Sequence, residues 1–144
     1  MVQTVRSLLR SKGHEVWSIG PASTVFEAIR LMSDKGIGAL VVLDEQRLVG
    51  ILSERDYTRN VILKDRSSRT TRVAEIMTRK VFYVGPELTA EECMALMTER
   101  RVRHLPVIEH DIVVGVISIG DVVKAVINAK GLLIEQLERY IVGG

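Results

Sequence analysis

The sequence contains an internal duplication that spans most of its length. Residues 16–61 align with residues 81–126 at a constant offset of 65, without a gap, and 14 of the 46 aligned positions are identical. A repeated unit of this size usually buries its apolar face against another copy of itself. We therefore expect two equivalent repeats, neither of which forms a stable domain alone.

The composition is that of an ordinary globular protein. Of the 144 residues, 47% are hydrophobic and 26% are charged, and only three are proline. Such a chain can bury a core of its own and gives no sign of disorder or low complexity. The formal net charge of +2 is too small to indicate DNA binding through bulk electrostatics.

The cysteine content and the apolar runs exclude further classes of protein. Cys93 is the single cysteine, which excludes an internal disulfide and a multi-cysteine metal site, and its helical surroundings predict an inert core thiol. No apolar run approaches the ~20 residues that span a bilayer. The N-terminus also lacks the pattern of a secretory signal, so we expect a cytoplasmic protein with no membrane partner.

The hydrophobic spacing changes in the same order in both repeats. Thr24 and Thr89 each follow a Gly-Pro pair and precede helical spacing, with a glutamate three residues on, which predicts an N-capping box. A second helical pattern begins at Ser53 and Ser118. Between these helices lie paired apolar runs of strand length, which predict two hairpins: 39–43 with 48–52, and 104–108 with 113–117. With a short strand before each Gly-Pro pair, the fold class is α+β, built as β-α-β-β-α twice.

The segments outside the repeats have their own patterns. Residues 2–12 and 132–141 have the spacing of packing helices, whereas residues 64–72 are polar and predict an exposed connector. The predicted organisation is an N-terminal helical segment at 1–15, a first repeat at 16–63, a linker at 64–80, a second repeat at 81–129 and a C-terminal helix at 130–144.

Each repeat carries the motif Gly, two aliphatic residues, Ser, two further residues and Asp, at 50–56 and 115–121. In one interpretation the serine and the aspartate form a capping box at the start of a helix. In the other, the glycine lets a ligand approach the strand, the helix N-terminus and serine hydroxyl favour a phosphate, and the carboxylate accepts hydrogen bonds from a ribose. The two interpretations are compatible.

The ordered motifs resemble the CBS domain, named for cystathionine β-synthase, in its tandem form as a small stand-alone pair. The resemblance covers about residues 16–127, and residues 77–80 resemble the segment that precedes a repeat in that family. It implies two repeats related by a pseudo-twofold axis, with adenine-nucleotide sites between them and frequent dimerisation. The matching positions of the first repeat are those of its motif together with Pro21, Thr24, Ala28, Met32 and Val42. Those of the second repeat are its motif together with Pro86, Thr89, Met97 and Val107.

The resemblance also implies which residues hold a nucleotide. Asp56 and Asp121 would bind ribose, and Ser53 and Ser118 would lie near phosphate, with Thr24 and Thr89 close by. The basic candidates for phosphate binding are Arg55, Arg59, Arg79, Lys80, Arg103 and His104. The candidates for adenine contact are Ser18, Ile19, Gly38, Ala39, Tyr83, Val84 and Pro106. Each basic residue could instead be a solvated surface charge.

The leading functional hypothesis is a regulatory adenine-nucleotide sensor that forms a homodimer and acts in trans on an unknown regulated protein. AMP is the first ligand choice, followed by NAD(H), ATP or ADP, and S-adenosylmethionine. The alternative is a structural dimerisation module whose Ser-x-x-Asp motifs serve only as caps. An enzyme is not expected, because the three histidines lack metal-ligand spacing and no nucleophile elbow, phosphate-binding loop or dinucleotide fingerprint occurs.

Overall fold

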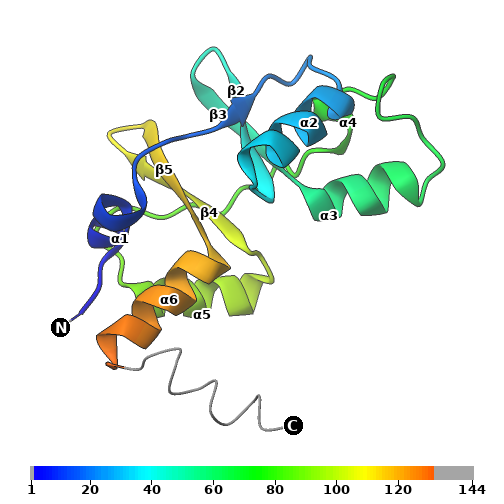
Figure 1. The fold of residues 1–144 in the computed structure, drawn as a ribbon. Helices are drawn as coiled ribbons and strands as arrows, with labels where there is room; N and C mark the ends of the chain where they lie inside the picture. Colours follow the sequence, from blue (N-terminus) through cyan, green and yellow to red (C-terminus); the bar gives the residue numbers. More distant parts are fainter. Residues whose placement is uncertain (1, 132–144) are drawn as a thin grey trace, which may run out of the picture. The chain divides into compact units, whose positions relative to one another are not determined.

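The structure is a computed structural model of the chain, and it describes residues 2–131. Contacts divide the chain into two compact units. The repeat-1 unit comprises Val16–Phe82, and the repeat-2 unit combines the residues up to Glu15 with those from Tyr83 onward. Figure 1 shows the helices and strands of both units in the colours of the sequence. The C-terminal helix predicted at 130–144 lies almost entirely outside the described residues.

The repeat-1 unit contains a three-stranded sheet in the order β1-β2-β3, with β1 parallel and β3 antiparallel to β2. A short α-helix continues as a single turn of π-helix after the third strand. The elements are β1 (Ser18–Ile19), α2 (Val25–Lys35), β2 (Ala39–Asp44), β3 (Arg47–Ser53), α3 (Glu54–Tyr57), the π-helix η1 (Thr58–Ile62) and α4 (Val73–Ile76).

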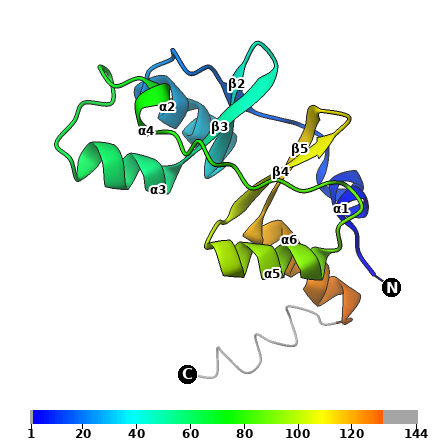
Figure 2. The ribbon, with the colours of Figure 1, turned by 180° about the vertical axis from the view of Figure 1, so that it is seen from behind.

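The repeat-2 unit repeats this plan with a shorter sheet. Its first strand is reduced to an isolated parallel bridge between Val84 and Val107. Figures 1 and 2 show α5 and α6 side by side on one side of the hairpin, and the two helices are in contact. The elements are α1 (Val5–Lys12), α5 (Ala90–Arg100), β4 (His104–Glu109), β5 (Ile112–Ser118) and α6 (Ile119–Ala129). The α+β class and the β-α-β-β-α order are thus confirmed.

The two hairpins turn in the same way at equivalent positions. Glu45 and Gln46 connect β2 to β3 with φ of 50° and 71°, and His110 and Asp111 connect β4 to β5 with φ of 53° and 64°. Positive φ at both residues of a two-residue loop is the geometry of a type I′ turn, whose twist matches that of the strands. The hairpin predictions are confirmed, each strand extending one residue further into the turn.

The predicted helix caps are also confirmed. Thr24 accepts a hydrogen bond from the backbone N–H of Glu27, whose side chain reaches back to the cap, and the same capping box joins Thr89 to Glu92. These side chains satisfy backbone donors that the first helical turn would otherwise leave unpaired. Both caps form from residues three apart, which is why the sequence predicts them.

The connector contributes to the core of the repeat-1 unit. Residues 64–72 are mostly exposed, as expected, but Thr71 is buried and its carbonyl accepts a hydrogen bond from Val25 at the start of α2. After it, Val73 and Ile76 of α4 and the following Met77 add three apolar residues to the core. The buried core members are Val25, Ala28, Met32, Leu40, Val42, Leu52, Val61, Val73, Ile76 and Met77.

Helix α1 covers the repeat-2 unit as α4 covers the repeat-1 unit. Val5 N donates to the carbonyl of Leu88 at 2.8 Å, and Val73 N donates to that of Ser23, also at 2.8 Å. The helix that precedes the first repeat in sequence therefore packs on the second. The apolar contacts of α1 are Val5, Leu8 and Leu9, and their counterparts beside α4 are Val73, Ile76 and Met77. In the part of the chain that the structure describes, no helix is both long and apolar enough to cross a membrane.

Candidate functional site

The first Ser-x-x-Asp motif stands where β3 passes into α3. Ser53 Oγ accepts a hydrogen bond from Asp56 N at 3.1 Å, and Asp56 Oδ2 accepts from Ser53 N at 2.9 Å and from Ser53 Oγ at 3.1 Å. A further, longer bond comes from Thr78 Oγ1 to Asp56 Oδ1 at 3.4 Å. The motif is a capping box, and all of its internal bonds to the carboxylate fall on one oxygen.

The second motif has the same cap but a different neighbour. Ser118 Oγ accepts from Asp121 N at 3.2 Å, and Asp121 Oδ2 accepts from Ser118 N at 2.8 Å. The ammonium of Lys12, at the end of α1, donates to Asp121 Oδ2 at 2.5 Å and to the carbonyl of Val116 at 2.7 Å. Asp121 thus forms an ion pair with Lys12.

The residues beside each serine differ between the repeats. Ala39 lies opposite Ser53 in the β2–β3 ladder, whereas His104 lies opposite Ser118 in the β4–β5 ladder. The preceding residue accepts the first backbone bond of the following helix: Glu54 N donates to Gly38 O at 3.0 Å, and Ile119 N donates to Arg103 O at 2.8 Å. Small neutral residues therefore flank the first motif and basic residues the second.

The His104 imidazole lies in an environment that disfavours its charged form. Burial lowers its pKa below the ordinary value, and the positive charges of Lys12 and Arg103 lower it further, whereas Asp121 opposes the shift. The surroundings of His104 therefore favour the neutral imidazole.

Burial of the Asp121 carboxyl by itself would raise its pKa. The hydrogen bond from Lys12 and those from Ser118 together outweigh burial, so the pKa of Asp121 lies below the ordinary value. The carboxylate is ionised at neutral pH, with a lysine as its counter-ion.

The structure gives the motif glycines a different role from the predicted one. A Cβ at position 50 would lie 2.6 Å from Met77 Sδ, and a Cβ at position 115 would lie 2.6 Å from Leu9 Cδ2. The chain itself fills the space beside Gly50 and Gly115. This corrects the expectation that these glycines let a ligand approach; they let α1 and the segment after α4 pack on the strands.

The remaining basic candidates are exposed. Arg55 and Arg59 follow Ser53 on α3 and η1, and Arg79 and Lys80 follow Thr78 in the same unit. The guanidinium of Arg79 donates to Ala74 O at 3.1 Å, and the Lys80 ammonium lies 5.9 Å from the centre of the Phe82 ring. Their role in phosphate binding stays a prediction.

The adenine candidates lie on or near the first strand of each repeat. Ser18 and Ile19 pair with β2, and Ser18 is exposed. Tyr83 is 58% exposed, whereas Val84 is 4% exposed and donates its N–H to Pro106 O at 3.0 Å. Gly38 and Ala39 lie beside Ser53, at the start of β2. The hydroxyls of Thr24 and Thr89 cap their own helices. Adenine contact stays a prediction for this set.

Sequence reasoning missed the two residues that contact the motif carboxylates from outside the repeats, Lys12 and Thr78. The sequence does carry a signal for Lys12. Val5, Leu8 and Leu9 match Val73, Ile76 and Met77 at an offset of 68 (73 − 5), which places Lys12 in register with Lys80. This offset differs by three from that of the main repeat, so an ungapped alignment conceals it.

Comparison with known proteins decides the family. A model of the CBS domain matches residues 5–62 and 73–128. The chain belongs to the CBS-domain family. It is 40% identical to the CBS domain-containing protein CBSX3, mitochondrial, of Arabidopsis thaliana, over 98% of this chain and 73% of that protein. The cytoplasmic location expected from the sequence stays a prediction, because the name of this relative points to another compartment.

Solved structures agree with the family. The CBS-domain structure NE2398 has a TM-score of 0.85 and 50% sequence identity, covering 88% of this chain and 99% of its own. The CBS-domain pair of protein MJ0100, in complex with 5′-methylthioadenosine and S-adenosyl-L-methionine, has a TM-score of 0.79 over 90% of this chain and 99% of its own. At 20% identity, the second comparison bears on the fold alone.

Proposed function

We propose that this CBS pair is a regulatory module that binds an adenosine-containing ligand through Asp56 and Asp121. Membership of the CBS family supports the proposal, and the pair from MJ0100 holds two adenosine compounds in its crystal structure. The observation that carries it is the unequal use of the two carboxylate oxygens in each motif.

In both motifs the cap bonds fall on Oδ2 of the aspartate. Neither Ser118 N nor Lys12 uses Asp121 Oδ1, and Asp56 Oδ1 accepts only the 3.4 Å bond from Thr78 among the bonds described above. The side chain of Asp121 is 24% exposed. A carboxylate with one oxygen outside the cap suits the 2′- and 3′-hydroxyls of ribose, because hydrogen bonds to charged acceptors are the stronger ones.

The residues beside Ser53 and Ser118 suggest that the two motifs prefer different ligands. Arg103 and His104 beside Ser118 suit a ligand that carries phosphate, whereas Gly38 and Ala39 beside Ser53 add no charge. AMP is our first choice, followed by NAD(H), ATP or ADP, and S-adenosylmethionine. By differential binding the ligand would shift the populations of conformers and so alter an unidentified partner in trans, with the pair acting as a homodimer.

We propose regulation rather than catalysis. The groups at the motifs are engaged in helix caps, and no cluster of three or more His, Cys, Asp or Glu side chains in residues 2–131 could hold a metal ion. The residues around Ser53 and Ser118 therefore suit recognition of a ribose and a phosphate. Prolonged incubation with ATP tests this view, and measurable turnover would contradict it.

Calorimetric titration tests ligand binding. AMP, ATP, NAD⁺ and S-adenosylmethionine are titrated into the full chain, with GMP as the control for the base. Asp56→Asn and Asp121→Asn should each weaken binding of the preferred ligand at its own motif by roughly tenfold or more, since each removes a charged acceptor. Glu27→Gln is the matched control, because Glu27 occupies the equivalent capping-box position of α2 and lies outside the motifs.

The capping boxes favour one alternative, a structural dimerisation module without a ligand. In that case Asp56→Asn and Asp121→Asn lower the stability, and no compound of the panel binds even at millimolar concentration. Binding that survives both aspartate substitutions would also overturn the proposed site.

A further inference from the structure

The Asp56 and Asp121 carboxylates, equivalent in the duplication, are approached by different groups. Lys12 donates an ammonium hydrogen bond to Asp121 at 2.5 Å, whereas Thr78 donates a hydroxyl hydrogen bond to Asp56 at 3.4 Å. A charge-assisted bond of this length is much the stronger of the two. Among the described residues, the carboxylate of Asp121 thus has a lysine counter-ion, whereas that of Asp56 has none.

The difference arises from the length of the covering helix. In the repeat-1 unit α4 ends at Ile76, Met77 is extended, and Thr78 forms a backbone bridge with Ile51. In the repeat-2 unit α1 stays helical to Lys12, about one turn further. Lys80, in register with Lys12, consequently lies over Phe82 rather than on the carboxylate.

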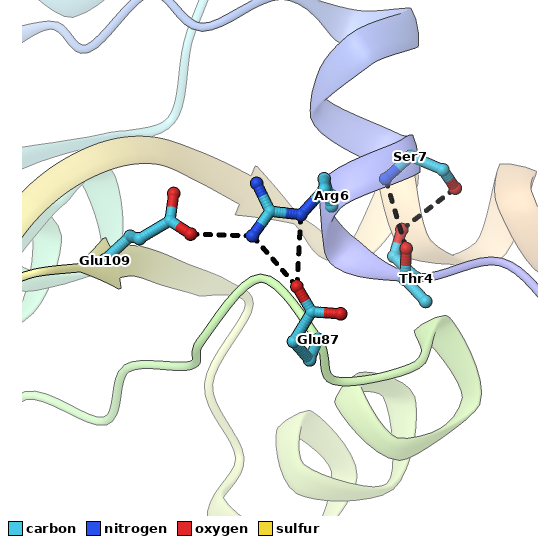
Figure 3. A network of polar contacts seen from close by, with 5 residues as sticks. All are labelled: Thr4, Arg6, Ser7, Glu87 and Glu109. Carbon is cyan, nitrogen blue, oxygen red and sulfur yellow. Dashed lines mark hydrogen bonds and ion pairs between the residues drawn. The ribbon is translucent and has the colours of Figure 1, made fainter.

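Several contacts anchor helix α1, which carries Lys12. Figure 3 shows the Arg6 guanidinium between two carboxylates: it donates to Glu87 at 2.9 and 3.1 Å and to Glu109 at 2.6 Å. Thr4 caps the helix, and Leu9 packs against the strand at Gly115. These contacts fix the backbone position from which the Lys12 side chain reaches Asp121.

We propose that Lys12 competes with ribose for Asp121 and so weakens ligand binding at this motif. This inference rests on the proposed function. Oδ2 is engaged in both motifs, but its partners differ: Ser53 alone holds that of Asp56, whereas Asp121 also accepts from the Lys12 ammonium, whose charge offsets that of the carboxylate. The ribose diol should therefore bind Asp121 more tightly once the lysine has left.

The test isolates the second motif in the full-length Asp56→Asn background. Lys12→Met is added to this background and AMP binding is measured by calorimetry. The Asp121 motif should bind AMP roughly fivefold more tightly without the lysine, the order expected for removal of a partly exposed ion pair. Arg10→Met is the matched control, since Arg10 is an exposed cation near the same end of α1.

The 2′,3′-dideoxy analogue of AMP separates competition for the diol from a general change in charge. It lacks both hydroxyls, so Lys12→Met should leave its affinity unchanged. A gain for AMP alone supports the inference, including the case in which binding appears only in the Lys12 variant.

Other results overturn it. Unchanged affinity overturns it, and weaker AMP binding would show instead that Lys12 is a ligand for phosphate. An equal gain for AMP and its dideoxy analogue would also contradict competition for the diol. If the wild type binds AMP and Lys12→Met changes nothing, only this inference fails. If neither protein binds AMP, the proposed function fails with it.

Discussion

Leu9 of α1 lies directly against Gly115 of β5, so closely that a Cβ at position 115 would meet its Cδ2 at 2.6 Å. Met77 lies against Gly50 of β3 in the same way. The motif glycines are therefore part of the packing of each covering segment. Gly50 and Gly115 therefore contribute to the stability of the fold rather than to ligand binding.

The first prediction concerns these glycines. Gly50→Ala and Gly115→Ala should each destabilise the protein by about 1 to 3 kcal/mol, the usual cost of overpacking. Gly50→Ala should cost more, because its Cβ would also lie 3.1 Å from the backbone oxygen of Thr78, whereas the three atoms nearest to a Cβ at position 115 all belong to the side chain of Leu9. Denaturant unfolding measures both, and a neutral Gly50→Ala would contradict this packing.

The second prediction concerns Cys93. Burial raises the pKa of its thiol to about 11, with a further contribution from the charge of Glu92. Since the thiolate is the reactive form, the folded protein should resist a disulfide reagent at mildly alkaline pH and react fully in guanidinium chloride. Cys93 is the single cysteine, so any labelling reports on it. Rapid labelling of the folded protein would refute its place in the core.

The third prediction is a pH dependence of stability caused by His104. Its pKa is lowered in the folded state, so the unfolded chain binds more protons between the two pKa values. Stability should be highest above about 6.5, the ordinary value, and should fall as the pH decreases through that window toward the folded pKa. Urea unfolding at several pH values measures the slope.

His104→Gln tests the origin of that slope. The variant should have a flatter dependence in the same window, because it removes the group that resists protonation. His14→Gln controls for loss of one imidazole at an exposed position. An unchanged slope in His104→Gln would assign the pH dependence to other groups.

The sequence predicted those features that form between residues close together in the chain. The capping boxes at Thr24 and Ser53 join residues three apart, and the β2–β3 hairpin closes across the two residues Glu45 and Gln46. Their geometry follows from local hydrogen bonds and turn conformation, which residue type controls directly. Because the sequence is duplicated, each of these predictions applies to both repeats.

The features that sequence reasoning missed depend on contacts far apart in the chain. Lys12 reaches Asp121 across 109 residues, and Thr78 reaches Asp56 across 22. Both contacts depend on where the covering helix ends, and the sequence did not reveal that α1 is one turn longer than α4. The role of Gly50 was missed for the same reason, because its neighbour Met77 lies after α4, far from Gly50 in the sequence.

The last prediction measures the Lys12–Asp121 ion pair without any ligand. Burial alone would raise the pKa of Asp121, and the bond from Lys12 is the first of the contributions that reverse the shift. Lys12→Met should therefore raise the pKa of this carboxyl, observed by carbon NMR, while the bonds from Ser118 continue to favour the charged form. A lowered folded pKa gives stability that is present above the unfolded value and lost as the pH falls through the folded one. The wild type should thus lose more stability on acidification than Lys12→Met, with Arg10→Met behaving as the wild type. An Asp121 pKa that does not respond to Lys12→Met would mean that the ion pair is absent in solution, and the inequality of the two motifs would then have to come from Arg103 and His104.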